Sequence, residues 1–81
     1  MTKSEIWDAV TKVFRDTLDL DDLVLTPATT AKDVEGWDSL NHILLVVAVE
    51  QKFGMKFNTG EIDALENVGQ FIDLIESKLP A

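Results

Sequence analysis

Cysteine is absent from this chain of 81 residues, and its absence narrows what the chain can do. Without thiols there are no disulfides and no thiolate metal site, so apolar packing has to stabilise the fold. Any reaction that requires sulfur would need a group added to the protein. A small domain without disulfides suits a reducing compartment, and we therefore expect a cytoplasmic protein.

Basic residues are also scarce. Seven Lys and Arg oppose fifteen Asp and Glu, which gives a net charge of −8. This balance argues against nucleic-acid binding, because binding to phosphates requires positive charge. The acidity either serves solubility alone or also attracts basic protein partners.

Long apolar runs are missing as well. The longest covers residues 43–49, seven residues, which is far short of a membrane span. Residues 1–8 are polar and mixed in charge, so we expect no signal peptide. The chain contains no internal repeat and no low-complexity segment. Its length predicts one domain covering residues 1–81, and we expect a monomer.

The apolar residues recur at helical spacing, and no segment alternates as a strand would. Capping and stop signals divide the chain into three longer helices and one short helix, which predicts an all-α fold, a small four-helix bundle. The first helix is expected to begin near Ser4, with Thr2 or Ser4 as its cap, and to end at the aspartates of residues 19–22. The second helix is expected over residues 39–53, with Asp38 before it and Gly54 after it. The third is expected from residue 59 to about 65, and the fourth from about 68 to about 79.

A long loop over residues 19–37 separates the first two expected helices. Loops of this length are uncommon in compact domains. This one carries apolar residues at intervals, which predicts that it packs over the core. Among them are Leu20, Leu23, Leu25, Val34 and Trp37.

Ser39 lies in the first turn of the second expected helix, directly after its capping residue Asp38. Free backbone N–H groups and the positive end of the helix dipole favour an anion there by about 0.3–1 kcal/mol. No general base adjoins Ser39 in sequence, so it is poorly placed to attack a substrate by itself. The hydroxyl is instead expected to be exposed and open to modification by another enzyme. Capped serines at helix starts are common, so this feature alone does not establish a site.

The second expected helix is apolar around most of its circumference. Leu45, Val49 and Phe53 can serve the core, with Val46 at the edge of this stripe. The remaining aliphatic residues would then form an exposed patch just beyond Ser39, unless the long loop covers part of it. Together with Asp38 and Glu50, we expect these residues to take part in partner recognition: Leu40, Ile43, Leu44 and Val47.

Asp38-Ser39-Leu40, followed by an apolar helix ending in Phe53-Gly54 and by Phe57, resembles the acyl carrier protein family. The likeness extends over essentially the whole chain. It implies that a phosphopantetheinyl transferase moves 4′-phosphopantetheine from coenzyme A onto Ser39, using Mg²⁺. The arm would supply the missing thiol and carry acyl groups as thioesters to acyl-activating, synthase or acyltransferase enzymes. The protein would then be no enzyme and bind no metal of its own, and Asp38 would assist transferase recognition.

The second expected helix departs from the pattern of carriers in fatty-acid synthesis, where it bears several acidic residues. Here it is nearly uncharged until Glu50, and Trp37 and His42 are also atypical. These differences favour a specialised carrier whose dedicated partners bind through apolar contact.

Three other functions stay open or are disfavoured. An aminoacyl or peptidyl carrier, loaded by an adenylating enzyme, would share the same motif. An unmodified acidic helical module could bind a partner helix on its apolar side. A hydrolase built from Ser39, Asp38 and His42 is disfavoured, because the chain has no Gly-x-Ser-x-Gly elbow. A calcium loop is also disfavoured. It would use aspartates such as Asp19, Asp21 and Asp22, but the glycine and terminal glutamate of such a loop are missing at the required spacing.

Overall fold

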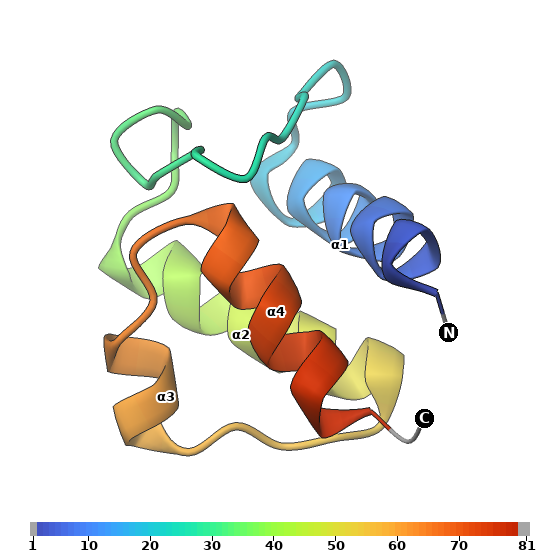
Figure 1. Ribbon diagram of the computed structural model, residues 1–81. Helices are drawn as coiled ribbons and strands as arrows, with labels where there is room; N and C mark the ends of the chain where they lie inside the picture. Colours follow the sequence, from blue (N-terminus) through green and yellow to red (C-terminus); the bar gives the residue numbers. More distant parts are fainter. Residues whose placement is uncertain (1, 80–81) are drawn as a thin grey trace.

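The computed structural model describes residues 2–79 and contains four helices in that range. They are α1 (Lys3–Leu18), α2 (Ser39–Phe53), α3 (Thr59–Asp63) and α4 (Val68–Lys78). Figure 1 shows the loop between α1 and α2 crossing beside the start of α4, while α3 lies apart near α2. The fold is therefore the expected all-α bundle, with three longer helices, one short helix and a long loop.

The helices begin and end at local signals that the sequence carries. Thr2 caps α1 through a capping box with Glu5, so Thr2 rather than Ser4 is the cap. Asp38 caps α2, and Gly54 ends it in the left-handed conformation at φ 67°. These bounds of α2 match the prediction.

One expectation about the later helices needs correction. The third helix was expected to reach about residue 65, but α3 ends at Asp63. Asn67 caps α4, since its side chain accepts the N–H of Gln70. The side chain of Gln70 accepts the N–H of Glu66, so Asn67 and Gln70 form no reciprocal capping box.

The core is formed by α1, α2, α4 and the loop. The helices contribute buried side chains at the expected spacing, and Val46 is buried rather than marginal. From the loop, Leu25, Val34 and Trp37 are buried. The loop is thus packed on the core, as predicted. The buried residues of the helices are Ile6, Val10, Val13, Phe14, Leu45, Val46, Val49, Val68, Phe71, Ile72 and Ile75.

Aromatic contacts connect this core to the start of α2. The ring of Trp37 meets that of Phe14 edge-on, with centroids 4.9 Å apart. Phe14 in turn contacts Phe71 at 6.2 Å, and Phe71 contacts Phe57 at 5.8 Å. Because Trp37 immediately precedes Asp38 and Ser39, the core fixes where α2 begins.

The short helix α3 is held mainly by polar contacts. Asn58 and Glu61 form a capping box, and Glu61 also forms an ion pair with Lys78 of α4 at 2.8 Å. The N–H of Asn58, and after it Lys78, lower the pKa of Glu61. None of the five residues of α3 is buried, which leaves this helix with little apolar area to hold it in place.

Candidate functional site

Ser39 is the first residue of α2 and is exposed, as predicted. The carboxylate of Asp38 accepts the N–H of Asn41 at 2.8 Å, and the carbonyl of Asp38 accepts the N–H of His42. The N–H groups of Ser39 and Leu40 have no acceptor within the helix. Ser39 therefore lies at the positive tip of α2, where an attached phosphate is favoured.

The turn before Ser39 is held from both sides. Gly36 adopts a positive φ of 84°, a conformation that costs residues other than glycine. Its carbonyl accepts hydrogen bonds from the N–H of Asp38 and from the side-chain amide of Asn41. The buried Trp37 side chain anchors the same turn to the core. The position of Ser39 is thus set by the packed end of the loop.

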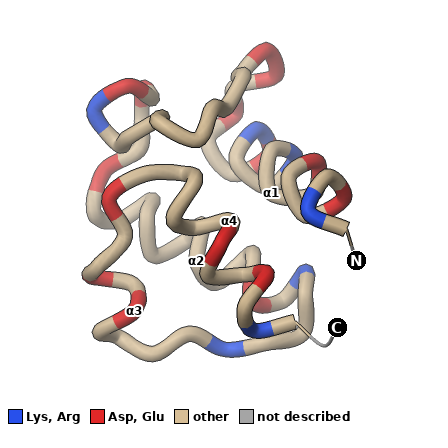
Figure 2. Tube along the Cα trace, viewed as in Figure 1, with Lys and Arg blue, Asp and Glu red and all other residues tan. Residues whose placement is uncertain are grey.

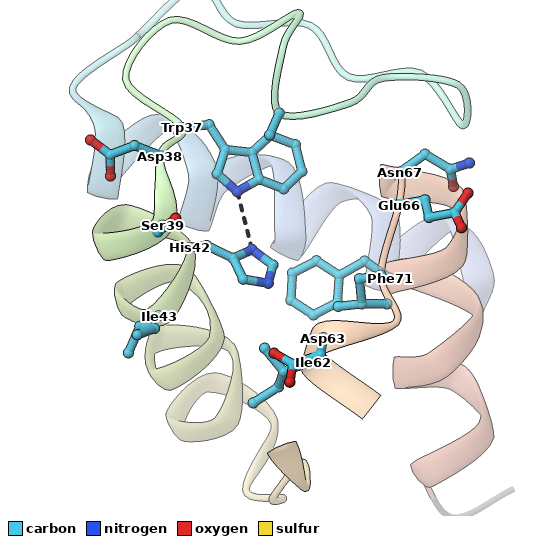
Figure 3. A pocket seen from close by; sticks show the side chains of 12 residues that line it. Trp37, Asp38, Ser39, His42, Ile43, Ile62, Asp63, Glu66, Asn67 and Phe71 are labelled. Atoms are coloured by element: carbon cyan, nitrogen blue, oxygen red, sulfur yellow. Dashed lines mark hydrogen bonds between the residues drawn. The ribbon is translucent and has the colours of Figure 1, made fainter. Parts of the chain in front are cut away.

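A cavity of about 480 Å³ opens beside Ser39. Ser39 and His42 line it from α2, Ile62 from α3 and Phe71 from α4, as Figure 3 shows. Leu65 also lines it, whereas the carboxylate residues Asp38, Asp63 and Glu66 add negative charge to its lining. Both apolar and acidic side chains therefore line this cavity next to Ser39. Sequence reasoning had not placed Ile62 and Phe71 beside Ser39.

The aliphatic patch on α2 is exposed. Leu40 is 68% exposed, Ile43 57%, Leu44 48% and Val47 42%. The loop over residues 19–37 was a possible cover for this patch, and it leaves all four side chains accessible. Such a continuous apolar face is typical of an interaction surface.

Two of the residues expected to recognise partners have roles within the fold. Asp38 is exposed, and its carboxylate also caps α2. Glu50 is half-buried, and its carboxylate accepts the N–H of Phe57 at 2.8 Å. Glu50 therefore holds the connector between α2 and α3, a role that its spacing in sequence did not indicate.

Acidic residues occur on the segments that precede and follow α2. Figure 2 shows Asp and Glu positions on the loop that leads into α2 and on α3. The exposed ones near the site are Asp33, Glu35, Asp38, Asp63 and Glu66. Residues 2–79 contain no group of three or more His, Cys, Asp or Glu that could hold a metal ion. No helix in the same range is long and apolar enough to cross a membrane.

A family model described as "Phosphopantetheine attachment site" matches residues 8–75. The chain is 33% identical over 82 residues to an acyl carrier protein of Thermosynechococcus vestitus, with both chains covered completely. It belongs to the acyl carrier protein family. It is 30% identical over 77 residues to acyl carrier protein 2, mitochondrial, of Arabidopsis thaliana, covering 95% of this chain and 61% of that protein.

A solved structure agrees with this assignment. The solution NMR structure of holo acyl carrier protein from Geobacter metallireducens has a TM-score of 0.84 and 44% sequence identity, covering 89% of this chain and 83% of that one. Acyl carrier proteins are carriers and not catalysts, so this chain is no enzyme. Its cofactor is covalently attached 4′-phosphopantetheine. The exposed Ser39, its free N–H groups and the adjoining cavity fit such a group.

Proposed function

We propose that Ser39 bears the 4′-phosphopantetheine arm, and that the protein carries acyl intermediates on it and presents them to biosynthetic enzymes. The observation that supports this most is the position of Ser39, an exposed residue that begins α2 beside a cavity. When bound, the arm supplies a terminal thiol that holds acyl groups as thioesters, which this cysteine-free chain cannot do by itself.

The residues around Ser39 each have a part in this function. The N–H groups of Ser39 and Leu40 stabilise the phosphate, and the helix dipole offsets its repulsion from Asp38. Trp37 keeps the start of α2 fixed to the core, so that a transferase meets the hydroxyl in one geometry. Asp38 presents a negative charge to the transferase.

The apolar lining of the cavity favours an acyl cargo over an aminoacyl or peptidyl one. Ile62, Leu65 and Phe71 offer hydrocarbon contacts to an acyl chain. An adenylating enzyme that loaded amino acids onto the arm would support the second kind of carrier. Loading assays with a panel of activating enzymes, including acyl-activating ones, separate the two.

The exposed aliphatic patch of α2 supports the proposal of a specialised carrier. Its partners would be the transferase and a small set of acyl-activating, synthase or acyltransferase enzymes with apolar contact surfaces. Loading by a housekeeping synthase should then be slower than loading of the main carrier of the same cell. Equal rates would contradict the idea of dedicated partners. We further propose that the carrier works as one domain over residues 1–81, as a monomer, in the cytoplasm.

The decisive experiment is intact mass spectrometry after co-expression with a transferase of broad specificity. The native chain should gain the mass of one phosphopantetheinyl group. Ser39→Ala should gain nothing, whereas Ser4→Ala should be modified normally. Ser4 is the matched control, because it is also an exposed serine in the first turn of a helix.

No mass gain in the native chain would instead support an unmodified helical interaction module. A gain that persists in Ser39→Ala would move the attachment to another residue. Either result would overturn the proposal.

A further inference from the structure

The turn that carries Ser39 is tied to α2 by a side-chain hydrogen bond between Trp37 and His42. Trp37 Nε1 lies 3.2 Å from His42 Nδ1, and the two rings are stacked with centroids 6.0 Å apart. The bond spans the first turn of α2, because Trp37 precedes Asp38 and Ser39 while His42 follows them (Figure 3). The edge-on contact of Trp37 with Phe14 connects the same turn to the core.

The chemistry of the two rings determines the protonation state in which this bond exists. An indole N–H can only donate, so His42 Nδ1 must accept, and the proton of the neutral imidazole is on Nε2. When the imidazole takes up a second proton, both of its nitrogens are donors. Nδ1–H then opposes the indole N–H, and the bond is lost. The contact is therefore present in the neutral state and disappears as the pH falls.

The other side-chain hydrogen bonds described for this turn use groups of a different kind. Asn41 donates to the carbonyl of Gly36 through its side-chain amide, and its N–H donates to the carboxylate of Asp38. Histidine is the side chain whose charge ordinarily changes between pH 5 and 8, and this chain contains one. A change of the turn over that pH range can therefore be assigned to His42.

The charged residues that share the cavity lining with His42 are all acidic. Asp38 precedes α2, Asp63 ends α3, and Glu66 lies in the connector to α4. In the described part of the chain, α1 contributes no residue to this lining, and α4 contributes an uncharged one. The carboxylates attract the imidazolium once it forms. The protonated ring thus has partners other than the indole, which favours release of the turn.

We propose that His42 is a positioning residue for the turn that carries Ser39, and that it holds this turn only while Nδ1 is unprotonated. The consequence for arm attachment rests on Ser39 as the attachment residue, whereas the contact itself does not. In the protonated state the first turn of α2 is released from Trp37, while Phe14 still holds the indole on the core. The loss is therefore local to the start of α2.

NMR of the unmodified native chain between pH 8 and pH 5.5 tests the contact itself. The Trp37 Nε1–H signal should move with the same midpoint as the His42 ring, and the ring ¹⁵N shifts at pH 8 should show the proton on Nε2. Trp7 is the internal control, because it lies on α1 and its indole signal should not follow that midpoint. A Trp37 signal that ignores the titration of His42, or a neutral ring protonated on Nδ1, would overturn the proposal.

Two substitutions separate protonation from a loss of packing. His42→Asn keeps an oxygen near the position of Nδ1 that gains no proton in this range, so its Trp37 signal should stay constant with pH. His42→Gln moves the amide outward to the position of Nε2, so its Trp37 signal should resemble that of the protonated native chain throughout. A Trp37 signal that still titrates in His42→Asn, or one that in His42→Gln matches the neutral native chain, would contradict the proposal.

Amide hydrogen exchange measures how far the start of α2 is released. The N–H groups of residues 41 and 42 bond to Asp38 at this end of the helix. Their protection factors in the native chain should fall roughly two- to tenfold on acidification, the effect of one hydrogen bond. They should stay constant in His42→Asn. An equal fall in both chains would count against a role of His42.

The consequence for modification is measured as a ratio of rates. We divide the rate at which a transferase of broad specificity modifies the native chain by its rate with His42→Asn. This ratio should fall roughly two- to tenfold from pH 8 to pH 5.5, and the pH profile of the transferase cancels in it. A constant ratio would overturn the positioning role. Failure of the proposed function is distinguishable, because neither chain would then gain mass at any pH.

Discussion

Gly69 offers a test of how tightly the long loop is seated on α4. A Cβ atom at this position would lie 2.9 Å from the carbonyl oxygen of Pro27 and 3.2 Å from its Cα. The backbone there is also bonded, since Gly69 N–H donates to Pro27 O and Val68 N–H donates to Thr29 O. Gly69→Ala must therefore displace the loop backbone, because no flexible side chain is available to move instead.

The magnitude follows from competing effects. Alanine is favoured over glycine within a helix by up to about 1 kcal/mol. Overpacking costs about 1–3 kcal/mol, and weakening the two hydrogen bonds adds about 0.5–1.5 kcal/mol for each. We expect Gly69→Ala to lower the free energy of unfolding by about 1–5 kcal/mol, although it improves the helix propensity. For a chain of this size, whose total is roughly 4–12 kcal/mol, this is a substantial loss.

Urea unfolding followed by circular dichroism measures the difference. With a slope near 1 kcal/mol/M, the midpoint for Gly69→Ala should fall by roughly 1 M or more. Gly60→Ala is the control, because a Cβ there would meet only Asn58 Oδ1, at an ordinary 3.5 Å. It should leave the midpoint unchanged or raise it. If Gly69→Ala is as stable as the native protein, the loop can move away from α4 without loss of stability, and its tight packing there would be refuted.

Three further predictions concern the surface. Asp38→Ala should destabilise the fold by about 1 kcal/mol, because the helix loses its cap, and Asp38→Asn should destabilise it by less. Asp38→Asn removes the negative charge, so equal transferase rates for this variant and the native protein would show that the transferase does not recognise that charge. The pKa of Glu61 is lowered, so its stabilising effect is full above pH 4.5 and is lost as the pH falls through its folded pKa. Glu61→Gln should therefore show a smaller loss of stability than native protein in urea titrations below pH 4.5. Leu44→Gln should slow loading by a dedicated partner roughly fivefold, a loss of about 1 kcal/mol. The control is Val24→Gln, because Val24 is exposed on the loop, and this variant should leave the loading rate unchanged. Equal effects of the two substitutions would argue against docking on α2.

The helices could be predicted closely because their signals are local. The caps Thr2, Asp38, Asn58 and Asn67 all bind an N–H three residues later, so their spacing is visible in the sequence. The exposed patch on α2 was also predictable, since one small core cannot bury a helix that is apolar on all sides. α3 was predicted too long, because the chain leaves the helix at Ala64 for a tighter turn, in which the N–H of Leu65 donates to the carbonyl of Ile62.

The contacts that shape the site could not be predicted in this way. The bond between Glu50 and the N–H of Phe57 depends on the path of the connector after Gly54. The pairing of Trp37 with His42 depends on how the loop end packs on Phe14. The cavity combines residues of three helices, and only their packing brings Ile62 and Phe71 beside Ser39. None of these relations repeats at a helical period.

The surface around Ser39 divides two kinetic tasks between two kinds of residue. Long-range attraction from the acidic side chains raises the frequency of encounters with a basic enzyme and weakens as salt is added. In the proposed docking on α2, the exposed aliphatic side chains act only after contact and set how long a complex lasts. Adding salt should therefore slow arrival far more than it hastens departure. The association rate of such a carrier can therefore be changed without changing the lifetime of its complex with each enzyme.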